Sequence, residues 1–128
     1  MEDPRTATVV LPAYGVDAAI GPVVRDLAVA SYALRARGID LDVLFLDGGD
    51  HSEEASKAAA ELGLDLTAVP GPASGPGEAF LEGLRRVSEA GSADLVVTLD
   101  ANGRHDPTQI PSLVDHLVER RSHVVIGS

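Results

Sequence analysis

The strongest constraint on the fold is a regular alternation between short apolar runs and longer segments with helical spacing. A run of four or five mainly apolar residues, bounded by turn-forming residues, is typical of a strand that is buried on both faces. The sequence contains five such runs, at residues 7–11, 42–46, 66–69, 95–99 and 123–127. Because segments of helical length separate most of them, the pattern predicts an α/β fold with a mostly parallel sheet of about five strands.

The connecting segments carry apolar residues at the spacing of an α-helix. The two clearest faces consist of Ile20, Val23, Val24, Leu27 and Leu34, and of Ile110, Leu113, Val114, Leu117 and Val118. Phe80, Leu84 and Val87 mark a third helix, and a weaker pattern covers residues 52–62. Right-handed crossovers should place helices on both faces of the sheet, as in a Rossmann-like three-layer sandwich. With 128 residues, the chain has room for one domain, residues 1–128.

Two segments between the predicted elements have a clear local signature. In HDPTQ, Asp106 is a natural helix N-cap, Pro107 suits the first helical position, and Gln109 nearly completes a capping box. Residues 70–77, PGPASGPG, are rich in glycine and proline and are predicted to form a loop.

Composition excludes several classes of function. The chain has 20 acidic and 10 basic residues, a formal charge of -10, which opposes binding to nucleic acid or to an anionic membrane surface. It has no cysteine, so disulfides and thiolate metal sites are excluded. No stretch of about 18 apolar residues is present. We therefore expect a cytoplasmic chain, attached to a membrane only through parts that would follow Ser128.

Candidate ligand-binding groups follow the predicted strands, because parallel α/β sheets bind ligands at the carboxyl ends of their strands. Asp47 and Asp100 each come directly after an apolar run. Asp47 either accepts hydrogen bonds from a ribose or base edge, or bonds the backbone of its own turn. Asp100 opens an Asp-Ala-Asn sequence. A D-x-D spacing can present two carboxylates to Mg²⁺ or Mn²⁺, but Asn102 is a neutral, weaker ligand, and a structural turn is the alternative.

Four segments, in order and at suitable spacings, carry a resemblance: VVLPAYGVDAAI, LFLDGGDHS, LVVTLDANGRHDPTQIPSLVDHL and VVIGS. Together they resemble family 2 glycosyltransferases of the GT-A fold, nearest to the polyprenyl-phosphate mannosyl- and glucosyltransferases. The resemblance covers essentially the whole chain. It implies the N-terminal part of a GT-A fold and a nucleotide-sugar donor as the partner.

The family's donor-binding positions can be carried over residue by residue. The resemblance implies that the nucleoside diphosphate faces Pro12, Ala13, Tyr14, Asp17, Asp47, Gly75, Gly77, Asp100, Asn102 and Arg104. Asp100 and Asn102 occupy the positions of the D-x-D pair that holds the metal, Mg²⁺ or Mn²⁺, on the diphosphate.

Six positions depart from the family pattern at this donor-facing edge. They are Gly15 and Val16 for Asn and Glu, Gly48 for the second aspartate of DDGS, Pro76 for lysine, Asn102 for the second metal aspartate, and Arg104 for glutamine. Since an amide replaces a carboxylate, we expect metal binding to be weak or lost. Arg104 either binds a diphosphate oxygen in place of the cation or points to solvent and bonds Asp106.

The resemblance also bears on activity. In the family, the acceptor site and general base follow a strand that usually ends in Gly-Ser-Arg, whereas this sequence ends at Ser128. We therefore expect the nucleotide-sugar-binding half of an enzyme that, at full length, transfers a sugar to a polyprenyl phosphate or similar acceptor. The 128 residues alone should not catalyse transfer. One alternative is a catalytically inactive GT-A-like binding or regulatory module. Another is an interaction domain that forms a homodimer through an exposed sheet edge.

Overall fold

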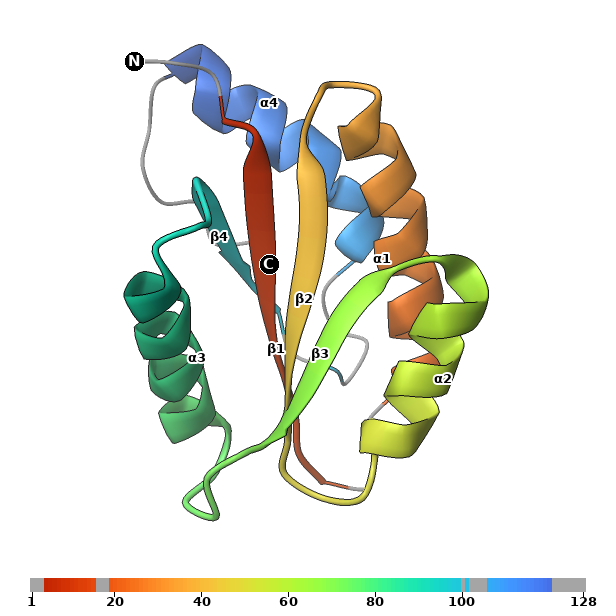
Figure 1. Cartoon of the computed structure of the whole chain (residues 1–128), viewed down its shortest axis with the longest axis vertical. Coiled ribbons are helices and arrows are strands. Elements are labelled where there is room, and N and C mark those ends of the chain that lie inside the picture. The colour runs from red at the N-terminus through yellow and green to blue at the C-terminus, as the bar shows by residue number, and fades with distance from the viewer. Residues whose placement is uncertain (1–3, 16–18, 100, 102–105, 121–128) are drawn as a thin grey trace.

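The computed structural model describes residues 4–15, 19–99, 101 and 106–120. Its described strands form one parallel sheet in the order β3-β2-β1-β4, with helices on both faces (Figure 1). The strands are β1 (Thr6–Ala13), β2 (Asp40–Asp47), β3 (Asp65–Pro70) and β4 (Leu95–Thr98). The helices are α1 (Ile20–Arg35), α2 (Ser52–Leu62), α3 (Pro76–Ala90) and α4 (Ile110–Arg120), with a 3-10 turn, η1 (Pro107–Gln109), before α4.

This architecture confirms the predicted Rossmann-like α/β sandwich. Four of the five apolar runs are strands, with bounds within two residues of the predicted ones. The fifth run, residues 123–127, lies outside the described residues. The described part of the sheet therefore has four strands where about five were expected.

The main core lies between the sheet and helices α1, α2 and α4. Strand β1 is buried from Ala7 to Ala13 because it has a strand on each side and helices over both faces. The predicted apolar face of α1 is confirmed, since Ile20, Val23, Val24, Leu27 and Leu34 are all buried. In α4, Ile110 and Val114 belong to the same core.

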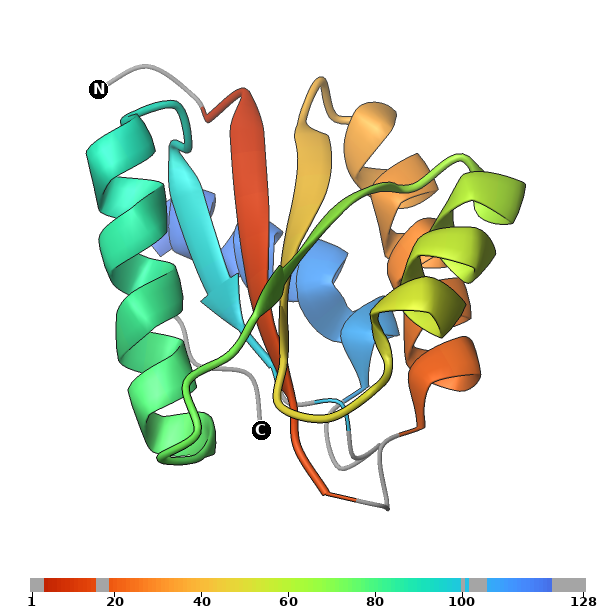
Figure 2. The same cartoon turned by 60° about the horizontal axis from the view of Figure 1, so that its bottom comes forward.

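Helix α3 covers the opposite face and contacts the sheet through small residues (Figure 2). Its buried residues are Ala79 and Gly83, and a Cβ added to Gly83 would lie 2.3 Å from Cγ1 of Val10. Phe80 packs beside this contact, whereas Leu84 is 40% exposed. The helix that Phe80, Leu84 and Val87 predicted is confirmed, and its closest contact with the sheet is made by smaller residues. A helix whose backbone lies this close to the sheet leaves room only for small side chains in the contact.

The predicted helix start at Asp106 is confirmed. Its carboxylate accepts a hydrogen bond from the backbone N–H of Thr108 at 3.0 Å, and Pro107 is the first residue of η1. The loop predicted over residues 70–77 is shorter than expected, because Pro70 ends β3 and Pro76 begins α3. Proline is tolerated on an edge strand and at the first position of a helix. Both prolines therefore belong to the flanking elements and not to the loop.

Within the described residues, no helix has both the length and the apolar character that crossing a bilayer requires.

Candidate functional site

The carboxyl ends of the strands lie side by side at one edge of the sheet. The pairing places Ala13 of β1 beside Asp47 of β2, and Asp47 beside Pro70 of β3. Beyond β4, the backbone N–H of Leu99 donates to the carbonyl oxygen of Val10 at 3.1 Å, and that of Ala101 donates to Pro12 at 3.2 Å. The segments that follow all four strands therefore meet at this edge, which we call the strand-end edge.

The strand-end edge includes the place where the strand order reverses. From β1 the chain passes to β2 on one side, whereas β4 lies on the other side of β1 (Figure 1). In open α/β sheets, ligands bind in the crevice beside such a switch point. The backbone N–H of Ala19, at the start of α1, donates to the carbonyl oxygen of Ala101 at 2.6 Å. The segments after β1 and β4 are thus joined directly at the switch point.

Tyr14 lies across the strand-end edge. Its hydroxyl donates to the carbonyl oxygen of Pro72, beyond the end of β3, at 2.7 Å. A Cβ added to Gly48 would lie 2.1 Å from two ring carbons of Tyr14, and one added to Gly71 would lie 2.3 Å from the hydroxyl oxygen. The side chain therefore extends from the end of β1, past the end of β2, to the segment after β3.

Both oxygens of the Asp47 carboxylate accept hydrogen bonds from the loop that follows it. It accepts hydrogen bonds from the backbone N–H groups of Gly49 at 2.9 Å, His51 at 3.0 Å and Ser52 at 2.8 Å. The Ser52 hydroxyl donates a fourth, at 2.6 Å. Three of these bonds go to Oδ2 and one to Oδ1, so both oxygens are engaged and Oδ1 keeps a second acceptor position. The structure thus shows an aspartate that bonds the backbone of its own turn, including the N–H of Ser52, the first residue of α2.

Electrostatics at the strand-end edge favour an ionised Asp47 and a protonated Tyr14. Desolvation by burial raises the pKa of Asp47, but the hydrogen bonds from Ser52, Gly49 and His51 together outweigh it, so the pKa is lower than usual. Burial, followed by the charge of Asp47, raises the pKa of Tyr14. At neutral pH, Tyr14 is therefore a hydrogen-bond donor, consistent with its bond to Pro72.

The other predicted site residues fall into two groups. Pro12 and Ala13 are buried at the end of β1. Gly75 precedes α3 with a φ of 115°, and Gly77 lies in its first turn; a Cβ added at either would meet nothing within 4 Å. The remaining four, which include both predicted metal ligands, lie outside the described residues: Asp17, Asp100, Asn102 and Arg104.

The described residues place two constraints on a metal site. They contain no group of three or more His, Cys, Asp or Glu side chains arranged to hold an ion. Asp47, the one predicted site aspartate within the described residues, accepts hydrogen bonds from N–H and O–H donors on both of its oxygens. The predicted metal ligands, Asp100 and Asn102, are not among the residues described.

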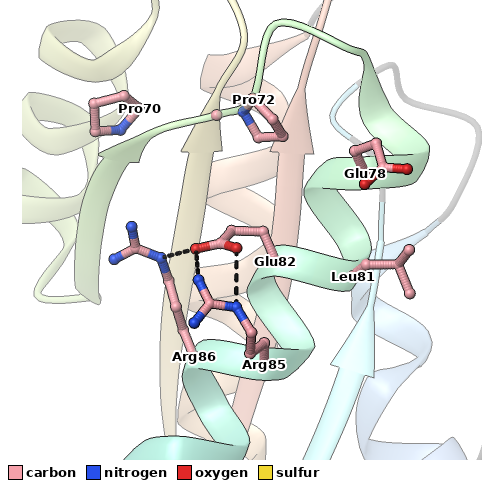
Figure 3. A pocket seen from close by; sticks show the side chains of 8 residues that line it. Pro70, Pro72, Glu78, Leu81, Glu82, Arg85 and Arg86 are labelled. Atoms are coloured by element: carbon pink, nitrogen blue, oxygen red, sulfur yellow. Dashed lines mark hydrogen bonds and ion pairs between the residues drawn. The ribbon is translucent and has the colours of Figure 1, made fainter.

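A surface hollow of about 340 Å³ lies next to the strand-end edge, between residues 70–72 and helix α3 (Figure 3). Arg85 and Arg86 both turn toward Glu82, at 2.5 and 3.0 Å, and Arg85 also pairs with Glu89 at 2.9 Å. These ion pairs already balance the charge of the arginines in an exposed setting, where such pairs contribute little. Among the described residues that line the hollow, no arginine is left unpaired to serve an anion site.

Two residues of the strand-end edge were missed as site residues from the sequence: Pro72 and Ser52. The contact of Pro72 is not displayed by the sequence pattern, because Tyr14 and Pro72 are 58 residues apart. Ser52 is only five residues from Asp47, to which it donates two hydrogen bonds. One signal was available. Gly48 departs from the family's DDGS motif, and a glycine allows another group to approach the backbone closely.

Comparisons with known proteins agree with this geometry. The sequence profile of Glycosyl transferase family 2 matches residues 8–128. An undecaprenyl-phosphate 4-deoxy-4-formamido-L-arabinose transferase of Pseudomonas paraeruginosa is 33% identical over 125 residues, which cover 94% of this chain and 34% of that protein. The crystal structure of mannosyl-3-phosphoglycerate synthase from Rubrobacter xylanophilus superposes with a TM-score of 0.55 at 22% identity, covering 89% of this chain and 37% of the other.

The structural match supports the fold, and the profile match supports the family. The chain spans about a third of the length of the curated relative that it matches. A profile match over nearly the whole chain agrees with the motifs at the ends of β1, β2 and β4. This chain therefore belongs to glycosyl transferase family 2.

Proposed function

We propose that the strand-end edge binds the nucleoside diphosphate of a sugar donor. The observation that carries this proposal is the convergence of the segments after β1, β2 and β4 at the switch point of the sheet, joined by hydrogen bonds from Gly48 to Ala13 and from Ala101 to Pro12. Parallel α/β sheets place ligands at this position, and members of the family use nucleotide-sugar donors.

In this proposal, the residues of the edge have distinct roles. Pro12 and Ala13 form its floor at the end of β1, and Tyr14 lies beside the base. Asp47 shapes the loop before α2 through its four hydrogen bonds. Asp100 and Asn102 face the diphosphate, with Arg104 available as a cationic partner for its oxygens. Mg²⁺ or Mn²⁺ binds weakly at Asp100 and Asn102, because a single carboxylate remains.

The activity proposed for the longer protein is transfer of the sugar to a polyprenyl phosphate. Support comes from the similarity to the undecaprenyl-phosphate transferase, which extends over 94% of this chain. That similarity covers 34% of the relative, and in this proposal the groups that bind and deprotonate the acceptor lie outside these 128 residues. The 128 residues supply donor binding.

Calorimetric titration of the whole chain with UDP- and GDP-sugars, with and without Mn²⁺, tests donor binding. Micromolar affinity is expected for one base. Asp100→Ala should weaken binding about tenfold or more, through loss of the one charged group at the predicted diphosphate position. Asp65 is the first residue of β3, at the end of the strand away from the strand-end edge. Asp65→Ala is therefore the matched control and should bind as the unchanged chain does. Equal losses in both variants would contradict the proposed site.

The role of the cation is tested by restoring the missing carboxylate. Asn102→Asp should increase the enhancement of nucleotide binding by Mn²⁺, because it adds a second charged oxygen ligand. If Arg104 replaces the cation in part, by binding a diphosphate oxygen, nucleotide binding by the unchanged chain should depend only weakly on Mn²⁺. Strict dependence on the metal before any substitution would rule out the arginine as its replacement.

A second candidate function is a binding or regulatory module without transferase activity. It is favoured by the hydrogen bonds of the Asp47 carboxylate to its own loop and by the Tyr14 side chain lying across the edge. Titration separates the two candidates, since absence of binding at millimolar UDP- and GDP-sugar supports the module and contradicts the donor site.

A further inference from the structure

Tyr14, Gly48 and Gly71 form one interlocked set at the strand-end edge. The Tyr14 ring lies where a side chain of residue 48 would begin, since a Cβ there would come within 2.1 Å of Cδ2 and Cε2. Its hydroxyl lies where a side chain of residue 71 would begin, at 2.3 Å. Contacts this short exclude any Cβ while the ring stays in place. With the ring in this closed position, both residues must be glycine.

Backbone conformation does not explain the two glycines. Neither Gly48 nor Gly71 is among the described glycines with positive φ, whereas Gly15, the residue after Tyr14, has a φ of 81°. A Cβ added at Gly15 would meet nothing within 4 Å, so glycine is favoured there by the positive φ of the turn and not by lack of space. At Gly48 and Gly71, the restriction comes from the space that Tyr14 occupies.

The closed position is held at the far end of the side chain. The hydroxyl of Tyr14 donates to Pro72 at 2.7 Å, and the backbone N–H of Gly71 donates to the carbonyl oxygen of Asp47 at 2.7 Å. Tyr14 is itself only half-buried, so rotation about its side-chain bonds can carry the ring away from the edge. Such a rotation would break one hydrogen bond and uncover the backbone of two adjacent glycines.

We propose that Tyr14 is a side-chain gate over the nucleotide-facing edge, held closed by Pro72 and displaced when a nucleoside diphosphate binds. The ligand part of this proposal rests on the proposed function. An open gate exposes Gly48 and Gly71, whose lack of side chains allows a planar base to approach the backbone closely. At position 48 the family has an aspartate and this chain has a glycine. The missing side chain leaves the space that the Tyr14 ring fills in its closed position.

A double-mutant cycle tests the closed position without any ligand. Gly48→Ala should lower the Tm by about 5 °C, because the new Cβ expels the ring and breaks its bond to Pro72. In the Tyr14→Ala background, the same substitution should change the Tm by less than about 1 °C. Gly21→Ala, with nothing within 4 Å of its Cβ, is the control and should show no coupling. Equal losses from Gly48→Ala in both backgrounds would overturn the gate.

A second variant covers the case in which Gly48→Ala does not fold. Gly71→Ala collides mainly with the hydroxyl of Tyr14, since the next nearest atoms lie at 3.1 and 3.2 Å. Tyr14→Phe removes that hydroxyl and should recover most of the Tm lost through Gly71→Ala. Recovery supports the closed position, and an unchanged loss contradicts it.

Titration of the whole chain and of Tyr14→Phe with UDP and GDP tests the gate itself. The phenylalanine variant keeps the ring but loses the bond to Pro72, so the open state is more populated and the nucleotide should bind about fivefold more tightly. Equal or weaker binding by the variant would overturn the gate. If neither protein binds UDP or GDP, the proposed function and the displacement of Tyr14 by nucleotide are both contradicted. The double-mutant cycle then still shows whether Tyr14 occupies the closed position.

Discussion

Replacing Asp47 with alanine is expected to lower the free energy of unfolding by about 2 kcal/mol. The substitution removes the acceptor of four hydrogen bonds, three of them from backbone N–H groups of Gly49, His51 and Ser52. It also removes a negative charge beside the N-terminus of α2, where the helix dipole favours one. Chemical denaturation of the two proteins measures the difference. Asp50→Ala, an exposed residue of the same loop, is the matched control and should change stability by less than about 0.5 kcal/mol.

The pH dependence of this loss identifies its cause. Because the folded state lowers the pKa of Asp47, the stabilisation is fully present above the unfolded pKa of about 3.9 and disappears as the pH falls through the lower, folded value. The difference in stability between the unchanged chain and Asp47→Asn should thus be constant near neutral pH and should shrink only below about pH 4. A difference that fades between pH 8 and pH 5 would contradict the assignment to this carboxylate.

Replacing Gly83 with alanine should have a comparably large effect, for a different reason. The new Cβ would lie 2.3 Å from Cγ1 of Val10 and 3.2 Å from Cδ1 of Leu46, both fully buried. Either α3 moves away from the sheet or the two side chains change rotamer, and overpacking of this kind typically costs about 1–3 kcal/mol. Alanine's better helix propensity recovers up to about 1 kcal/mol, so a net loss of about 1–2 kcal/mol is expected.

Gly77→Ala is the matched control for the helix-propensity effect, since Gly77 lies in the same helix with nothing within 4 Å of its Cβ. It should leave stability unchanged or slightly increased. Val10→Ala removes the atom that the new Cβ meets, so the cost of Gly83→Ala should fall by about half or more in that background. If Gly83→Ala lowers the free energy of unfolding equally with and without Val10→Ala, the contact with β1 is not the cause of the loss.

The fold was predictable because it depends on patterns that are local in the sequence. Each apolar run is long enough for one strand, and the face of α1 from Ile20 to Leu34 repeats with helical spacing. Asp106 and Pro107 mark a helix start within three residues. Helix α3 was predicted from its large apolar residues, but they do not show which residues lie closest to the sheet. The contact belongs instead to Ala79 and Gly83, four residues apart, a spacing of small residues that does signal close packing.

The candidate site was less accessible from the sequence, since its contacts connect distant segments. Family motifs indicated the strand-end edge and Tyr14, but not that the tyrosine reaches Pro72 and excludes side chains at positions 48 and 71. The Asp47 motif was ambiguous because the same carboxylate can bind a ligand or its own loop. The bonds from the N–H groups of residues 49–52 show the second of these roles, and the sequence alone does not display them.

The measurement that tests the central claim most directly is the mapping of nucleotide binding by NMR. UDP and GDP, each with Mg²⁺, would be titrated into the isotopically labelled chain while backbone amide signals are followed. Signals of Gly48, Gly71 and Ala101 should shift together and saturate, because these residues lie at the strand-end edge. Signals of Gly38, Gly63 and Gly91, at the opposite ends of the strands, should stay in place. Saturable shifts confined to the opposite ends, or no shifts at millimolar nucleotide, would contradict a donor site at the strand-end edge.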